Sequence, residues 1–348
     1  MAYTTVNKST DYFNTKTYTG NSSTLNVTGV GHQPDFTWIK DRSSSGDDHA
    51  MYDAVRGVNK RIRSNQNDAE NTETAALTSF DSDGFTVGTA GSSNGNGDSF
   101  VAWNWKAGGG QGSSNTDGSI NTTYTSVNTT AGFSICSYTG TGSNATVGHG
   151  LGVAPKMILI KRLSAADNWI VYHNSLGGTK NLYLDATNAE ATRSDTFNNT
   201  APTSSVFSLG SATGTNGSGQ TYIAYCFAEK TGYSKFGYYV GNGNADGTFV
   251  YTGFKPAFFM IKRTDGAGDK WRLWDNARSP FNLVDDSLAP NESSVDYVDA
   301  SVSLDFLSNG YKMKMSGGGA GNGSGEIYIF MAFGQSIVGS NNVPCTAR

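Results

Sequence analysis

The sequence has little charge, and this shortage bears on its secondary structure. Only 16% of its 348 residues are charged, whereas an average soluble domain has about 25%. Glutamate, which together with lysine builds most exposed helices, occurs only at positions 70, 73, 190, 229, 292 and 326. Ser, Thr and Asn stand where charged residues would be expected, and these side chains compete with helical hydrogen bonds. We therefore expect little helix.

Cysteine, basic charge and long apolar runs are also in short supply. Cys136, Cys226 and Cys345 are too scattered for a disulfide framework or a zinc site, and we expect them to be reduced, buried small residues. The net charge of −4 offers no basic surface to a phosphate backbone. No run of apolar residues is long enough to cross a membrane, and no secretory signal opens the chain. We expect synthesis in a cytoplasm, no nucleic-acid partner and no membrane insertion.

Glycine and aromatic residues are abundant instead. The chain has 44 Gly, and Phe, Trp and Tyr make up 12% of it. This many aromatic side chains can fill a core, which argues against disorder, and short alternating segments between Gly- and Asn-rich turns are typical of β-sandwiches. The composition predicts an all-β protein.

Internal repeats determine the predicted organisation. A Tyr–x–Gly turn, a Pro followed by an apolar run ending in Ile-Lys, and an Asn-Gly-x-Gly loop before an aromatic strand recur in the same order. The markers are Tyr18, Tyr138 and Tyr239; Pro34, Pro155 and Pro256; and Asn94, Asn216 and Asn322. The sequence therefore predicts three tandem β-sandwich or jelly-roll-like units of about 100 residues each, with little helix.

The repeat sets the predicted boundaries. Unit 1 spans residues 1–106 with a short N-terminal arm at 1–12, unit 2 spans 132–230, and unit 3 spans 231–348 with a C-terminal tail at 335–348. The Gly-, Ser-, Asn- and Thr-rich segment 107–131 has the composition of a flexible or extended linker. Units 2 and 3 are joined by a much shorter and stiffer junction.

Catalytic signatures are weak throughout the sequence. Gly91–Gly95 matches Gly-x-Ser-x-Gly but precedes a strand, whereas that motif requires a strand-to-helix turn. The four His occur singly, and no Glu pair has the spacing of a glycosidase on a strand. We predict no catalytic, cofactor-binding or metal residues. Structural calcium is left open, with oxygen ligands from residues 242–246 or from Asp47 and Asp48.

Two sets of recurring residues have alternative interpretations. Lys40, Lys161 and Lys262 each follow a buried-type strand; we interpret them as solvated strand ends, with a binding face as the alternative. Aromatic side chains could stack on sugar rings, and the candidate receptor-binding residues are Trp169, Tyr172, Trp271 and Trp274. Matched aromatics such as Trp105, Phe227 and Phe333 are interpreted as a common core.

Several segments together carry a resemblance to a known family. They include residues 29–40, 100–110, 148–155, 222–229, 304–310 and 342–348. Over essentially the whole chain, the sequence resembles tandem-repeat β-domain virion structural proteins of tailed bacteriophages. These tail-fibre-like proteins are found especially in marine phages of the cyanophage type.

The resemblance implies a non-enzymatic role on the virion exterior. The first expectation is a tail-fibre or receptor-binding component that contacts a host surface glycan or protein. The alternatives are a capsid or tail decoration protein and, more remotely, a carbohydrate-active sandwich enzyme. The implied partners are other virion proteins and copies of the chain itself, with a trimer favoured because trimers hide sheet edges. The expected outermost surface is the loop end of units 2 and 3, for example residues 214–219.

Overall fold

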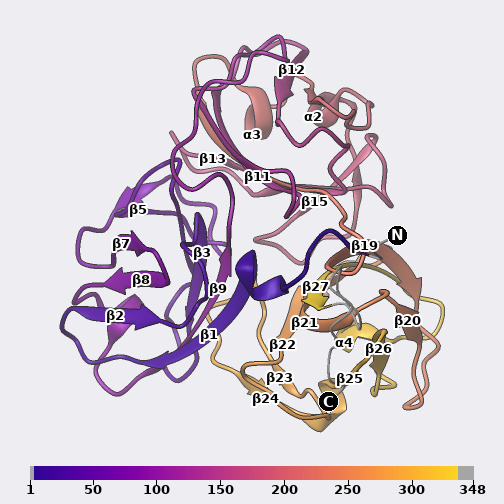
Figure 1. The fold of residues 1–348 in the computed structure, drawn as a ribbon. Helices are drawn as coiled ribbons and strands as arrows, with labels where there is room; N and C mark the ends of the chain where they lie inside the picture. Colours follow the sequence, from indigo (N-terminus) through magenta and orange to yellow (C-terminus); the bar gives the residue numbers. More distant parts are fainter. Residues whose placement is uncertain (1–3, 336–348) are drawn as a thin grey trace.

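The computed structural model describes residues 4–335. It is an all-β fold in which many short antiparallel strands alternate with turns, and its few helices are single turns of three or four residues (Figure 1). Figure 1 shows three lobes around a common centre, one from each predicted unit. No helix among these residues is long and apolar enough to cross a membrane.

Each unit contributes a similar succession of elements. Unit 1 contains η1 (Ser9–Asp11), β1 (Phe13–Thr19), β2 (Leu25–Thr28), β3 (Phe36–Asp41), β4 (Ala50–Asp53), β5 (Lys60–Arg61), β6 (Asn71–Thr72), β7 (Leu77–Asp81), β8 (Gly84–Val87), α1 (Gly91–Asn94) and β9 (Ser99–Trp105). The connecting segment and unit 2 contain β10 (Tyr124–Asn128), β11 (Phe133–Thr139), β12 (Ala145–Gly148), β13 (Met157–Arg162), β14 (Ile170–His173), β15 (Lys180–Tyr183), β16 (Ala191–Thr192), α2 (Ser194–Phe197), β17 (Val206–Leu209), α3 (Thr213–Asn216) and β18 (Thr221–Phe227). Unit 3 contains β19 (Ser234–Val240), β20 (Phe249–Tyr251), β21 (Lys255–Arg263), β22 (Arg272–Asp275), β23 (Asp286–Ser287), β24 (Tyr297–Val298), η2 (Ala300–Val302), β25 (Leu304–Leu307), β26 (Gly310–Met313), α4 (Gly318–Gly321) and β27 (Ile327–Gln335).

The three units build sheets of the same strand order. The inner sheet of each unit, which faces the centre of the molecule, runs β1-β9-β3-β4, β11-β18-β13-β14 or β19-β27-β21-β22. The outer sheets are β2-β8-β7, β12-β17 and β20-β26-β25. Every inner sheet is therefore sandwiched between its own outer sheet and the centre of the molecule.

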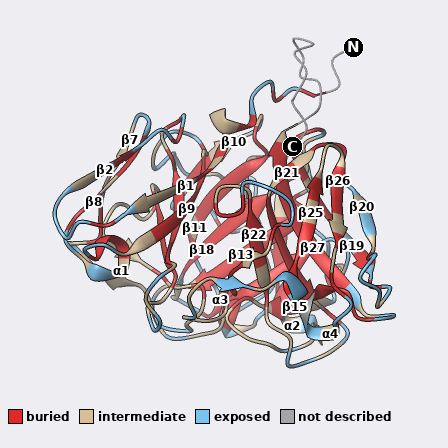
Figure 2. Cartoon of the chain, turned by 90° about the horizontal axis from the view of Figure 1, so that it is seen from below, coloured by how far each residue is buried: buried red, intermediate tan, exposed pale blue. Residues whose placement is uncertain are grey.

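This two-sided burial explains why the central strands are continuously apolar. Along β13, Met157 and Leu159 point into the central core, whereas Ile158 and Ile160 point into the core of unit 2. Because successive side chains of a strand alternate between its faces, a strand covered on both sides needs apolar residues at every position. In Figure 2 the inner strands are buried along most of their length.

Matched aromatic residues of all three units meet at the centre. The ring centroids of Trp105, Phe227 and Phe333 lie 5.8 to 6.2 Å from one another. Trp105 and Phe227 end β9 and β18, and Phe333 lies near the end of β27. All three belong to a single core cluster that draws on the three units. The interpretation of these aromatics as common core is confirmed.

The segment 107–131, predicted to be a flexible or an extended linker, packs against units 1 and 2, so the flexible alternative is wrong. The amides of Ala107 and Gly109 donate to the Asp35 carboxylate at 2.7 and 2.9 Å. Ile120 is buried in the core of unit 2, and β10 pairs antiparallel with β11. Backbone pairing and side-chain anchors replace the freedom that a Gly- and Ser-rich composition would otherwise give.

The recurring Tyr and Asn markers meet in one loop of each unit. The hydroxyls of Tyr18, Tyr138 and Tyr239 donate to the carbonyls of Ser93, Thr215 and Gly321 at 2.6 to 2.7 Å. The next residue in each loop is Asn94, Asn216 or Asn322, whose buried amide donates to Gly88, Gly210 or Met315. Residues 214–217 are buried, so the expectation of an outermost surface is wrong for them, whereas Ser218 and Gly219 of the same loop are exposed.

Candidate functional site

Neighbouring units meet along three seams that use matched atoms. In each seam a ring nitrogen of one unit lies within hydrogen-bond distance of a backbone carbonyl of the preceding unit, with unit 3 preceding unit 1. The pairs are Trp169 with Arg63 (2.7 Å, seam 1–2), Trp271 with Tyr183 (2.8 Å, seam 2–3) and His49 with Ala289 (3.1 Å, seam 3–1). The seams thus close the three units into a ring within one chain.

The recurring lysines lie at these seams and are buried, so their interpretation as solvated strand ends is wrong. The Lys161 ammonium of unit 2 donates to Asn67 O of unit 1 at 3.0 Å. The Lys262 ammonium of unit 3 donates to Thr187 O of unit 2 at 3.3 Å. Burial lowers the pKa of both lysines to about 8 and also lowers that of Lys40. Each ammonium group donates to backbone carbonyl oxygens.

Two of the seams hold a buried arginine between two acids. In seam 1–2, Arg56 bonds to Asp53 at 2.5 Å and to Glu70 at 3.2 Å. In seam 3–1, Arg278 bonds to Asp275 at 2.6 Å and to Asp296 at 2.9 Å. Both arginine side chains are almost fully buried. A buried guanidinium charge is tolerated only when acids are paired with it, and each arginine has two such partners.

Seam 2–3 lacks this arrangement. Leu176 stands where the other seams have Arg56 and Arg278, and His173 stands at the place of the strand-end aspartate. The His173 ring lies 3.2 Å from Phe330 O, and burial lowers its pKa to about 4, so the ring is neutral. Glu190, which stands at the place of Glu70, forms its ion pair with Lys180, whose side chain is partly exposed.

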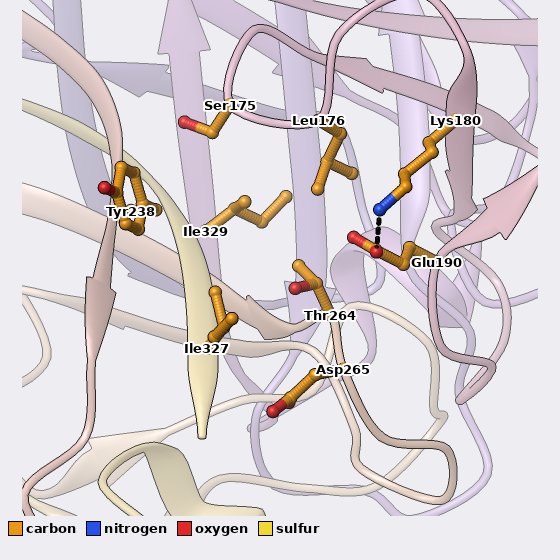
Figure 3. Close-up of a pocket in the computed structure, with 9 residues that line it drawn as sticks. All are labelled: Ser175, Leu176, Lys180, Glu190, Tyr238, Thr264, Asp265, Ile327 and Ile329. Atoms are coloured by element: carbon orange, nitrogen blue, oxygen red, sulfur yellow. Dashed lines mark hydrogen bonds and ion pairs between the residues drawn. The ribbon is translucent and has the colours of Figure 1, made fainter. Parts of the chain in front are cut away.

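A pocket opens at this seam, between unit 2 and unit 3. It has a volume of about 230 Å³ and is lined by Ser175, Leu176, Lys180, Glu190, Tyr238, Thr264, Asp265, Ile327 and Ile329. Figure 3 shows aliphatic side chains between the Tyr238 ring on one side and the Lys180–Glu190 pair on the other. The arrangement offers an apolar surface together with a charged and hydroxyl-bearing rim.

The side chains from unit 3 differ from those at matched places in the other units. Tyr238 pairs with Ile329 across β19 and β27, just as Ser137 pairs with Ile223 and Thr17 pairs with Val101. An aromatic ring thus replaces a small hydroxyl side chain in unit 3 alone. Similarly, Ile327 occupies the place of Thr221 and Ser99, as the same strand pairings show.

Both replacements leave apolar surface exposed to water. Tyr238 is 62% exposed and Ile327 is 39% exposed. If unit 3 only repeated the packing of units 1 and 2, polar residues would stand at these two positions, as they do in those units. The sequence contains this signal, but it becomes visible only when strand pairing shows which residues of the three units correspond.

Charge in the pocket is slightly negative. Burial acts to raise the pKa of Asp265, but its hydrogen bond from Arg263 and nearby backbone amides outweigh that effect, and the pKa lies below its ordinary value. Asp265 is therefore ionised at neutral pH. Lys180 and Glu190 neutralise each other, and Arg263 also bonds to Asp269 and Glu326.

The four aromatic candidates named from the sequence do not line this pocket. Trp169, Tyr172, Trp271 and Trp274 are each at most 1% exposed. Trp169 and Trp271 anchor the seams, whereas Tyr172 and Trp274 fill the cores of units 2 and 3. Stacking on a sugar requires an exposed ring face, so these four residues form no binding surface in this structure.

The remaining sequence candidates are engaged in local structure. Cys136 and Cys226 are free, buried thiols, and Cys345 lies outside the described residues. In the loop 242–246, the side-chain oxygens of Asn242 and Asn244 accept hydrogen bonds from backbone amides two residues later. Among residues 4–335, no three His, Cys, Asp or Glu side chains are grouped as metal ligands would be.

The fold and its seams define a class: an all-β protein in which three sandwich-like units share a central core. The chain belongs to the family described as Domain of unknown function (DUF7483), which matches residues 8–336. This match extends through all three units and the segment that connects units 1 and 2. Comparisons with curated proteins and with solved structures found no match.

Proposed function

We propose that this protein is a non-enzymatic structural protein on the exterior of a tailed-phage virion, and that it acts as a tail-fibre or receptor-binding component. It would be made in the host cytoplasm and would bind other virion proteins and a glycan or protein of the host surface. The sequence resemblance supports the virion role. The structural support for a contact role is the distribution of apolar side chains on the surface.

Exposed large apolar residues are concentrated in unit 3. Within residues 4–335 there are ten such residues, and nine of them belong to this unit: Tyr238, Val240, Phe249, Tyr251, Phe281, Leu283, Tyr297, Val298 and Ile327. The tenth is Val153 of unit 2. Figure 2 shows β20 exposed along the outer side of unit 3. Because gathered apolar surface marks interaction sites, unit 3 is the part of the molecule suited to contact.

The proposal is tested on infection and on particles. Purified protein should reduce phage adsorption, and the double variant Phe249→Ser/Tyr251→Ser should lose this effect, whereas Val153→Ser should retain it. Labelled protein should be found at the tail in imaged particles. A regular array over the capsid would instead identify a decoration protein, and release of reducing sugars from host polysaccharide would identify an enzyme. Absence from the particle would refute the virion role altogether.

A homo-oligomer, with a trimer favoured, remains part of the proposal. Its physical reasons are the burial of sheet edges and the multiplication of weak contacts. The first of these is met in part within one chain, since β10 covers the edge of β11 and the seams join the three units. The molar mass in solution decides between a trimer and a single chain.

A further inference from the structure

The pocket at seam 2–3 has the chemistry of a sugar-binding site. We propose that it binds the ring of one neutral pyranose within a glycan, an inference that rests on the proposed receptor-binding function and names the ligand of that function. The argument has three parts: the apolar wall, the polar rim and the charge.

The apolar wall fits the face of a pyranose ring. Tyr238 is 62% exposed and, together with Leu176, Ile327 and Ile329, lines one continuous cavity. The carbon–hydrogen face of a sugar is apolar and packs on aromatic and aliphatic surfaces, while a tyrosine hydroxyl remains hydrated at a wet interface. The volume of about 230 Å³ suits one ring rather than an extended ligand.

The polar rim can hydrogen-bond to the hydroxyls at the edge of that ring. Figure 3 shows the Lys180 ammonium directed at Glu190, with the Asp265 carboxylate and the Ser175 and Thr264 hydroxyls around the same space. An ammonium carries three donors and a carboxylate has about four acceptor positions, so one ion pair does not exhaust either group. Sugar hydroxyls both donate and accept, and this rim provides partners for both.

The charge distribution selects among possible ligands. Two carboxylates and one ammonium line the pocket, and Lys180 is already paired with Glu190. Asp265 is paired with Arg263 at 2.9 Å, and Arg263 also bonds to Asp269 and Glu326. A phosphate or an acidic sugar would therefore meet carboxylates whose cations are already engaged. A neutral, hydroxyl-rich ring meets no such cost.

The internal repeat shows how the lining of this pocket differs from that of its counterpart. A cavity of about 270 Å³ lies at the matched place of seam 1–2, and its lining includes the buried Arg56 with Glu70. At seam 2–3, Leu176 stands in place of that arginine, and Tyr238 and Ile327 stand in place of Ser137 and Thr221. Seam 2–3 therefore differs in having an apolar wall, which is the feature that a sugar ring requires.

The experiment uses the full chain and the methyl glycosides of glucose, galactose, mannose and N-acetylglucosamine as probes. Binding is followed by saturation-transfer NMR at millimolar concentration, with titration of any sugar that gives a signal. We expect at least one neutral glycoside to bind. Tyr238→Ala should weaken that binding by about fivefold, because the loss of ring stacking is of the order of 1 kcal/mol.

The control is Val153→Ala. Val153 is 44% exposed, belongs to unit 2 and lies outside both the pocket and the apolar surface of unit 3, so this variant should bind as the unchanged protein does. Glu190→Gln, which keeps the shape of the side chain, should also weaken binding. Circular dichroism checks that the variants fold.

Four outcomes would overturn the inference: no neutral glycoside binds, only acidic sugars bind, Tyr238→Ala binds normally, or Val153→Ala loses binding to the same extent. These results are separable from failure of the proposed function. A protein that is found on the virion and blocks adsorption but binds no sugar refutes only the pocket. A protein whose pocket binds sugar but which is absent from the particle refutes only the virion role.

Discussion

Phe333 is the residue through which the shared core can be tested most directly. Its side chain is 2% exposed, and its ring lies among rings from every unit. The neighbours within 5.2 to 6.1 Å, measured between centroids, are Phe13, Trp105, Phe227, Tyr233, Phe236 and Phe258. The substitution Phe333→Ala therefore removes a ring at the point where the three inner sheets meet.

The expected cost follows from this position. Replacing a buried phenylalanine with alanine costs about 3–5 kcal/mol, depending on how well the site can collapse. Neighbouring aromatic rings contribute about 0.5–1.5 kcal/mol per pair beyond the buried area. Because rigid inner sheets surround the ring on several sides, collapse is limited, and we expect the upper half of the range, about 4–5 kcal/mol. Typical domains are stable by only about 5–15 kcal/mol.

The assay combines chemical denaturation with hydrogen exchange resolved along the chain. Amides of β3 in unit 1 and β13 in unit 2 should exchange faster in Phe333→Ala, together with those of unit 3, because all three sheets pack on the same core. The control is Phe249→Ala, the same substitution at a largely exposed ring of unit 3, which should change stability by less than about 1 kcal/mol. Faster exchange confined to unit 3 would contradict the shared core and favour three independent domains.

Three further predictions concern the seams and loops. Lys161 has a pKa lowered from 10.5 to about 8, so between these pH values the unfolded chain holds a proton that the folded chain lacks, and stability should rise with pH. At about 1.4 kcal/mol per tenfold change in proton affinity, the gain in the free energy of unfolding is about 3 kcal/mol. Denaturation curves should show a smaller rise in Lys161→Met, and an equal rise in the variant would contradict the prediction. Leu176→Arg should place a guanidinium beside Glu190, replace part of the apolar wall with charge and abolish glycoside binding in the NMR assay while the melting temperature shows that the fold persists; unaltered binding would show that the ligand lies elsewhere. Asn216→Ala removes a buried amide that bonds to Ser143 O and Gly210 O at 2.6 and 2.7 Å and should cost about 2–3 kcal/mol in denaturation, whereas a loss below about 0.5 kcal/mol would contradict its role in holding the loop.

Much of the architecture could be predicted because it depends on local patterns. The continuous apolar run from Met157 to Ile160 indicated a strand covered on both faces, and the structure has one core on each side of it. The Asn-Gly loops recurred because a buried asparagine holds each of them in the same way. Alternation and turn chemistry are properties of neighbouring residues, so they are visible in the sequence.

The errors concerned residues whose environment comes from another unit. Lys161 follows a strand and looked solvated, but Asn67 O of unit 1 covers its ammonium. Trp169 and Trp271 looked like exposed stacking platforms, but they donate to carbonyls of the preceding unit. Segment 107–131 looked flexible because its composition does not reveal that β11 offers it an edge.

The candidate site was missed for the same reason. Tyr238 and Leu176 are ordinary residues in their own strands, and they become part of a pocket only because unit 3 docks against unit 2. By itself the sequence determined the all-β class, the recurring markers and the faces of the strands, because periodicity and turn residues act over short distances. Only the tertiary structure decided that the three units share one core, which lysines are buried and which seam has an apolar pocket. These features depend on contacts between residues about a hundred positions apart, as between Tyr183 O and the Trp271 indole.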